Sequence, residues 1–229
     1  MEKIEEKLWS KVNRYIPYLR WVPFLRMVAV CNNLAFGKVD AKSDIDLFII
    51  AKRGRLFTVR ILVTFILQIL GVRRHGNKVA GRFCLSFFVD DSFLDLSKIA
   101  IENDVYLAYW VASLKPVIDD GVSSEFWAEN KWVESFFENG ELKYDVSRVL
   151  ARPSNIFAFL FPKFVESLLK RWQLKRARKK AALAGDGADL MVEEHVLKFH
   201  NIDRRKIYRD RWEEIFGSQK LTAKKFKEL

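Results

Sequence analysis

The chain has few cysteines and lacks several common catalytic motifs. Its 229 residues include two cysteines, Cys31 and Cys84, and both lie in apolar runs. This pattern argues against a disulfide framework and predicts buried, reduced thiols in a cytosolic protein. There is no glycine-rich phosphate loop, no Gly-x-Ser-x-Gly elbow and no Cys-x-x-Cys pair, so the chemistries that need them are disfavoured. His195 and His200 are five residues apart, which is poor helical geometry for a shared metal.

No uncharged apolar run is long enough to span a membrane. The N-terminus is charged and lacks an apolar run with a cleavage site, so no secretory signal is predicted. The most apolar segment, Leu56 to Leu70, is interrupted by Thr58, Arg60, Thr64 and Gln68. At about 1.5 Å per residue it would reach roughly 22 Å, short of the roughly 30 Å hydrocarbon core of a bilayer. We therefore expect a helix buried against a sheet and no integral membrane segment.

Positive charge and aromatic side chains are abundant. The formal net charge is +11, and 50% of the residues are hydrophobic, 14% being aromatic. Such a composition supports a sizeable core and argues against disorder. The excess of positive charge favours a polyanionic partner, which would be a nucleotide, a nucleic acid or an anionic membrane surface. Simple solubility is the alternative explanation for this charge.

The hydrophobic pattern predicts an α+β fold in two parts. An amphipathic helix is expected over 2–20, ended or kinked by Pro17. The remaining expected elements are strands over 27–31, 44–51 and 83–89, the helix over 56–70, and helices over 103–114, 123–137, 155–181, 189–199 and 204–216. We therefore predict a small mixed β-sheet domain flanked by helices (1–115), followed by an all-helical C-terminal domain with a basic surface (116–229).

Two carboxylates two residues apart open the second expected strand, in the segment Ser43-Asp44-Ile45-Asp46-Leu47-Phe48-Ile49-Ile50. Strand side chains alternate between faces, so Asp44 and Asp46 are expected to point the same way. Two acids on one face repel each other unless a cation lies between them, and Mg²⁺ accepts oxygen ligands while keeping substrate phosphates in its shell. The pair therefore predicts a metal site for phosphoryl or nucleotidyl transfer. An acidic turn that opens an ordinary strand is the alternative.

The strand Val28-Ala29-Val30-Cys31 stops at Asn32-Asn33, and ten residues separate Asn33 from Asp44. This arrangement resembles the DNA polymerase beta-like nucleotidyltransferase superfamily. The signature of that family is an apolar strand ending in Gly-Ser or Gly-Gly, a spacer of similar length, and Asp-x-Asp on the next strand. The resemblance covers residues 27–50 directly and extends more loosely to the strand at 83–89.

The resemblance implies a Mg²⁺-dependent nucleotidyltransferase that uses two metal ions. Such an enzyme moves a nucleoside monophosphate from an NTP to a hydroxyl or phosphate acceptor, RNA being one candidate. Asp44 and Asp46 match the first two metal ligands of the family. The residues expected to contact the triphosphate or neutralise its charge precede or adjoin this pair, and are Asn32, Asn33, Lys38, Lys42 and Ser43.

The chain departs from the family pattern in two places. Asn32-Asn33 replaces Gly-Ser, although asparagine tolerates left-handed backbone angles and its amide can donate to phosphate. The family also places a third acid on a neighbouring strand, where this chain has Cys84 and Ser86 on the relevant face. Asp90 and Asp91, just beyond that strand, are possible substitutes. These departures leave open a slow enzyme, a different catalytic base, or a catalytically inactive domain that binds nucleic acid or a protein partner.

Two basic segments are further candidates for anion binding. Lys163 to Lys180 carries eight basic residues against one acid, Glu166, and Trp172 is available for stacking on a base. A membrane-surface helix and an ordinary solvated helix face are the alternatives. The second segment is a turn that faces either phosphates or water and carries Arg73, Arg74, His75 and Lys78.

Overall fold

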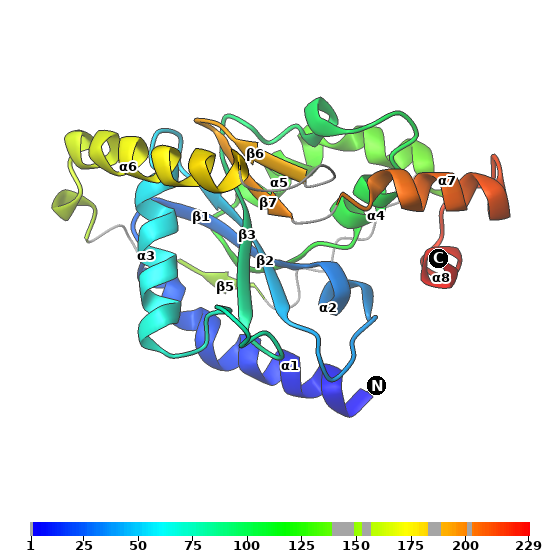
Figure 1. Ribbon diagram of the computed structural model, residues 1–229, viewed down its shortest axis with the longest axis horizontal. Helices are drawn as coiled ribbons and strands as arrows, with labels where there is room; N and C mark the ends of the chain where they lie inside the picture. The colour runs from blue at the N-terminus through cyan, green and yellow to red at the C-terminus, as the bar shows by residue number, and fades with distance from the viewer. Residues whose placement is uncertain (1, 139–148, 153–156, 183–188, 201–202) are drawn as a thin grey trace.

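A computed structural model of the protein describes residues 2–138, 149–152, 157–182, 189–200 and 203–229. Its centre is a mixed β-sheet with the strand order β5-β4-β1-β2-β3-β7-β6 (Figure 1). The strands are β1 (Leu25–Cys31), β2 (Ile45–Ala51), β3 (Phe83–Asp90), β4 (Lys115–Asp119), β5 (Leu150–Ala151), β6 (Asp189–Val192) and β7 (Val196–His200). The pairs β2–β3 and β4–β5 are parallel, and the other neighbouring pairs are antiparallel.

Helices cover both faces of this sheet. The α-helices are α1 (Glu2–Tyr15), α2 (Asn32–Phe36), α3 (Leu56–Ile69), α4 (Val105–Ala112), α5 (Val122–Glu129), α6 (Lys163–Ala182), α7 (Arg205–Phe216) and α8 (Ala223–Glu228). The 3₁₀ helices are η1 (Ile16–Trp21), η2 (Leu96–Ile99), η3 (Lys131–Phe136) and η5 (Ala158–Leu160). Apolar side chains of α1 and α3 pack on one face of the sheet, and those of α4, α5, α7 and α8 contribute to the core on the other.

The central strands are buried on both faces. In β2, Leu47 and Ile49 belong to the core cluster on the α3 side, whereas Phe48 and Ile50 belong to the cluster on the α4 side. A strand covered on both faces needs apolar residues at successive positions, which explains the continuous run after Asp46. This burial fixes the register of β2 and therefore the direction in which its first polar residues point.

Two helices predicted from the sequence are confirmed. The helix expected over 56–70 is α3, and Val59, Val63 and Leu67 bury one side of it against the sheet. The helix expected over 2–20 is α-helical to Tyr15 and continues as the 3₁₀ helix η1, with Pro17 in its first turn. Within the part of the chain described, no helix has both the length and the apolar run that a membrane crossing requires.

The prediction of an all-helical second half is wrong. Residues 189–199 were expected to be helical but form a hairpin of β6 and β7, and β7 pairs with the edge of β3. An uncovered edge of β3 would leave backbone N–H and C=O groups without partners, and β7 supplies those partners while burying Val196 and Leu197. A further unexpected strand, β4, pairs with β1. The proposed boundary between residues 115 and 116 falls inside β4, so the sheet takes strands from both predicted parts.

Candidate functional site

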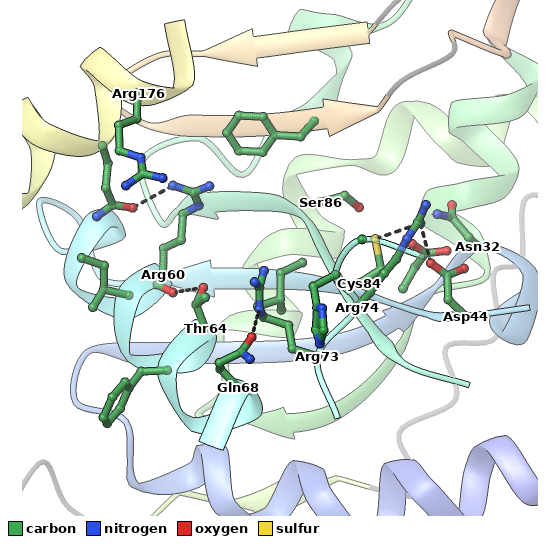
Figure 2. A pocket seen from close by; sticks show the side chains of 18 of the residues that line it. Asn32, Asp44, Arg60, Thr64, Gln68, Arg73, Arg74, Cys84, Ser86 and Arg176 are labelled. Carbon is green, nitrogen blue, oxygen red and sulfur yellow. Dashed lines mark hydrogen bonds and ion pairs between the residues drawn. The ribbon is translucent and has the colours of Figure 1, made fainter. Parts of the chain in front are cut away.

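A pocket of about 1310 Å³ opens beside the ends of the central strands (Figure 2). The acid pair lines it, together with side chains from the start of α2, from β3, from α3, from α6 and from the turn before β3. Figure 1 shows α6 lying across one end of α3, and the two helices are in contact. The pocket therefore joins residues from the first and last thirds of the chain.

Asp44, Asp46 and Cys84 converge in this pocket. Asp44 immediately precedes β2, and Asp46 is the second residue of that strand. Because β2 and β3 are parallel neighbours, Cys84 lies directly opposite Asp46 in the register. One ligand atom from each of the three residues lies within 4.8 Å of the others. The structure thus brings together the two predicted carboxylates, and it places the thiol of Cys84 on the neighbouring strand beside them.

The negative charge of Asp46 is held at an energetic cost. Burial, and then the charge of Asp44, raise the pKa of Asp46 to about 6, although hydrogen bonds from Asn32 and Cys84 partly oppose this change. Burial also raises the pKa of Cys84 to about 12, and the charges of Asp46 and Asp44 add to the increase. The thiol is therefore protonated at neutral pH. A divalent cation between the carboxylates would relieve their repulsion.

A guanidinium lies beside the acid pair. Arg74 Nη1 donates a hydrogen bond to Asp44 Oδ2 at 2.6 Å, and it lies 3.6 Å from Cys84 Sγ. The Arg74 side chain is 39% exposed and that of Asp44 is 14% exposed, so the arginine approaches from the solvent side. The donor set fits a divalent cation that shares its shell with phosphate oxygens, provided that Arg74 moves away from Asp44. Among the residues that the structure describes, this donor set contains no third carboxylate.

The two asparagines line the pocket, as the sequence led us to expect. Asn32 begins α2 with a positive φ of 55°, which is the left-handed backbone that asparagine tolerates. Its side chain also receives a hydrogen bond from Tyr106 Oη, at 3.5 Å from Oδ1. Asn32 is therefore positioned by both its backbone and its side chain between the acid pair and α4.

The other three residues expected to contact the triphosphate do not line the pocket. Ser43 is buried and its Oγ donates to Asp40 Oδ1 at 2.9 Å. Lys42 is exposed, and its backbone N–H donates to the same Asp40 oxygen at 2.8 Å. Lys38 lies among the positive charges of Arg211 and Lys227. The structure thus assigns Ser43 and Lys42 to a turn organised by Asp40.

The interpretation of Asp90 or Asp91 as the third acid is wrong. Asp90 pairs with Ala51 at the opposite end of the parallel strands, six residues from Cys84 and so roughly 20 Å away. Asp90 is fully buried and lies 2.9 Å from His195 Nδ1, and Asp91 forms an ion pair with Arg26 at 3.0 Å. Ser86 is different, because it is buried and lines the pocket.

Sequence reasoning missed a polar stripe on α3. Arg60, Thr64 and Gln68 all line the pocket and are four residues apart, which places them on one helix face. The same three residues were visible as interruptions of an apolar run, so their spacing was an available signal. From α6 the pocket receives Trp172, Gln173 and Arg176, and the turn before β3 supplies Arg73, Arg74 and His75 but not Lys78.

The single acid of the basic segment fixes α6 against α3. Glu166 is buried, and its two carboxylate oxygens accept the backbone N–H groups of Phe57 and Thr58, each at 2.9 Å. A carboxylate at this position stabilises the positive end of the α3 dipole. This contact holds α6 beside the pocket, which Arg176 of the basic segment lines. Other basic side chains of α6 are exposed, namely Arg171, Lys175 and Lys179.

Comparisons with known proteins give no relative for this chain. No family model matches it, and no curated protein and no solved structure does so either. The case for a function therefore depends on the residues and the geometry described above.

Proposed function

We propose that the protein is a Mg²⁺-dependent nucleotidyltransferase that moves a nucleoside monophosphate from an NTP to a hydroxyl or phosphate acceptor. The observation that carries this proposal is the convergence of Asp44 and Asp46 on one pocket, with ligand atoms within 4.8 Å of each other and of Cys84. Two carboxylates that repel each other in a half-buried site gain most from a divalent cation, and Mg²⁺ is normally bound by one or two carboxylates plus substrate phosphates.

Each residue of the site has a role in this proposal. Asp44 and Asp46 hold the metal, which supplies charge neutralisation at the triphosphate when it is bound. Asn33 and the amide of Asn32 contact the triphosphate from the start of α2. Arg74 exchanges its bond to Asp44 for one to a phosphate oxygen, because a guanidinium binds phosphate at least as well as carboxylate. The reduced cysteines agree with a cytoplasmic enzyme.

Nucleotide binding and turnover test the proposal together. Calorimetry with Mg²⁺ and the α,β-methylene analogues of the four common NTPs is expected to show binding that chelation of Mg²⁺ abolishes. The double variant Asp44→Asn, Asp46→Asn is expected to lose this binding and any pyrophosphate release while keeping its circular dichroism spectrum. Asp210→Asn is the control, because that side chain is 64% exposed on α7, outside the residues that line the pocket. Binding and turnover that survive in the double variant would rule the proposal out.

A second candidate is a catalytically inactive protein of this fold that binds nucleic acid or a protein partner. The ion pair of Arg74 with Asp44 favours it, since the arginine already neutralises part of the acid pair. The exposed basic residues of α6 would then contact an RNA backbone. Salt-sensitive RNA binding that is weakened by Arg171→Gln with Lys175→Gln, without pyrophosphate release from any NTP, would select this candidate.

A further inference from the structure

The pocket contains a second group of charges, which we call the arginine subsite, formed by Arg60, Arg73 and Arg176. Figure 2 shows Arg60 and Arg176 at the end of the pocket away from Asp44, with Arg73 between the two ends. Among the described residues, no ion pair joins any of these three guanidiniums to a carboxylate. Three like charges thus line one pocket, and none of them is paired with a carboxylate in the part of the chain that the structure describes.

This arrangement is electrostatically unfavourable without a ligand. Burial, and then the charges of Arg73 and Arg176, lower the pKa of Arg60 to about 10. Lowering by neighbouring positive charges means that the cluster repels itself. A bound anion would remove this repulsion and would form charge-assisted hydrogen bonds that are stronger than neutral ones.

Neutral partners hold the guanidiniums in place. Arg60 Nη1 donates to Gln173 Oε1 at 2.8 Å, and Gln173 in turn donates to the backbone oxygen of Phe57 at 2.9 Å. Arg73 Nε donates to Gln68 Oε1 at 2.8 Å. These bonds orient the arginines without neutralising them and leave most of their N–H donors for a ligand.

Two aromatic rings support Arg60 and Arg176. The guanidinium carbon of Arg60 lies 4.9 Å from the centre of the Phe199 ring, and that of Arg176 lies 5.0 Å from the Trp172 ring. An arginine that is stacked and hydrogen bonded in advance loses less conformational entropy when it binds an oxyanion. The arginine subsite is therefore preorganised for an anion with several oxygens.

We propose that the arginine subsite binds a phosphate monoester on the acceptor substrate, and that this phosphate is the group that receives the nucleotide. The inference rests on the proposed function, in which Asp44 and Asp46 hold the Mg²⁺ of the nucleotide at the other end of the same pocket. The proposed function allows either a hydroxyl or a phosphate as the acceptor group, and this inference selects the phosphate.

The residues that line the pocket support a phosphate over a hydroxyl. A hydroxyl acceptor must give its proton to a base, and carboxylates commonly fill that role. Among the described residues lining the pocket, the carboxylates are Asp44 and Asp46, and both would be engaged in holding the metal. A phosphate monoester has a second pKa of about 6 and is mostly dianionic at neutral pH, so it attacks without a base.

The reaction balances without transfer of a proton. An acceptor phosphate oxygen forms a bond to the α-phosphorus of the NTP, and the bond from that phosphorus to the bridging oxygen breaks. The electron pair leaves with pyrophosphate, so the products are pyrophosphate and an acceptor joined to the nucleotide by a diphosphate. His75, which also lines the pocket, has no required role in this step.

The phosphate could belong to a soluble molecule or to a lipid headgroup. The exposed side chains Phe65 and Trp172, which are 59% and 53% exposed, line the same pocket. Both sources present the same phosphate monoester to Arg60 and Arg73, so the test includes one probe of each kind.

Binding without nucleotide or metal tests the arginine subsite directly. Calorimetry in EDTA measures binding of glycerol 3-phosphate, the soluble probe. Sedimentation measures binding to phosphatidylcholine vesicles with one tenth phosphatidate, the lipid probe. Vesicles that contain phosphatidylglycerol in place of phosphatidate are the control. Arg60→Gln and Arg73→Gln are each expected to weaken binding of the preferred probe about tenfold or more, the usual loss for one charge-assisted hydrogen bond. Arg14→Gln, an equal charge change at an exposed position of α1 outside the residues that line the pocket, is expected to change it less than about twofold.

The outcomes separate this inference from the proposed function. Failure of both probes to bind, or losses in Arg60→Gln and Arg73→Gln no larger than in Arg14→Gln, would overturn the arginine subsite. If Arg60→Gln fails to fold, Arg73→Gln decides, because the hydrogen bond described for the Arg73 side chain goes to the exposed Gln68. Phosphate binding that needs Arg73 in a protein that binds no Mg²⁺·NTP would leave the subsite standing and remove the nucleotidyltransferase. Turnover with a hydroxyl acceptor that depends on His75 and not on Arg73 would support the nucleotidyltransferase and overturn the arginine subsite.

Discussion

Replacing Asp46 by asparagine should make the folded protein more stable. The gain in stability should appear only above acidic pH, where Asp46 of the wild type is ionised. The pKa of Asp46 is raised from 3.8 to about 6, chiefly because the side chain is buried and secondly because Asp44 is charged. A folded state with a raised carboxyl pKa holds its proton more tightly than the unfolded chain, so ionisation destabilises the fold. The penalty is absent below the unfolded pKa, grows as the pH rises from about 4 to 6, and is complete above the folded pKa.

The size of the effect follows from the change in pKa. A difference of about two units corresponds to roughly 3 kcal/mol at neutral pH, and the partial exposure of the side chain makes about 2–3 kcal/mol a fair expectation. Asparagine avoids the charge while its amide oxygen can still accept the hydrogen bonds from Asn32 and Cys84. At pH 4 the two proteins should differ by less than about 1 kcal/mol, because Asp46 is then neutral in the folded state and only about half ionised in the unfolded chain.

Urea unfolding of the wild type and Asp46→Asn between pH 4 and 8 measures this difference. Asp210→Asn, an exposed carboxylate on α7, serves as the control and should show no comparable gain at pH 8. A stability difference that stays constant from pH 4 to 8, or a variant less stable than the wild type at pH 8, would refute the reasoning. It would mean that the folded protein already compensates the charge of Asp46 fully.

Three further predictions concern single side chains. Arg74→Ala should strengthen Mg²⁺ binding in the absence of nucleotide, because it removes the guanidinium that lies 2.6 Å from Asp44; calorimetry measures this, and weaker binding would contradict it. Glu166→Gln should lower the free energy of unfolding by about 2 kcal/mol, since a buried charge caps α3. Glu193→Gln, at an exposed position, is its control in the same urea titration. Cys84 should resist iodoacetamide at pH 8 in the folded protein and react in urea, because its pKa is about 12; rapid labelling of the native thiol would refute this.

The two carboxylates of the site could be predicted because their signal is local. Strand alternation places Asp44 and Asp46 on one side whatever the rest of the fold does, and the apolar run after them identifies a buried strand. The helix over 56–70 was equally readable from its length and periodicity. The left-handed backbone of Asn32 also follows from a local preference of asparagine.

Other parts of the fold and site depend on partners distant in sequence. The β6–β7 hairpin forms where the edge of β3 supplies hydrogen bonds to β7, and nothing within 189–200 encodes that edge. Likewise, Glu166 looked like one acid in a basic helix, and its burial comes from the N–H groups of Phe57 and Thr58. Long-range pairings of this kind leave no periodic signal in the segments that make them.

By itself, then, the sequence identified four side chains that line the pocket, namely an acid pair and two asparagines at the ends of buried strands. Only the tertiary structure decided what surrounds them. The parallel register of β2 and β3 sets Cys84 opposite Asp46, and the turn before β3 brings Arg74 to Asp44. The contact of α6 with α3 places Arg176 near Arg60. The physical reason is that alternation and helical period act within a few residues, whereas the composition of a pocket is set by which elements pack together.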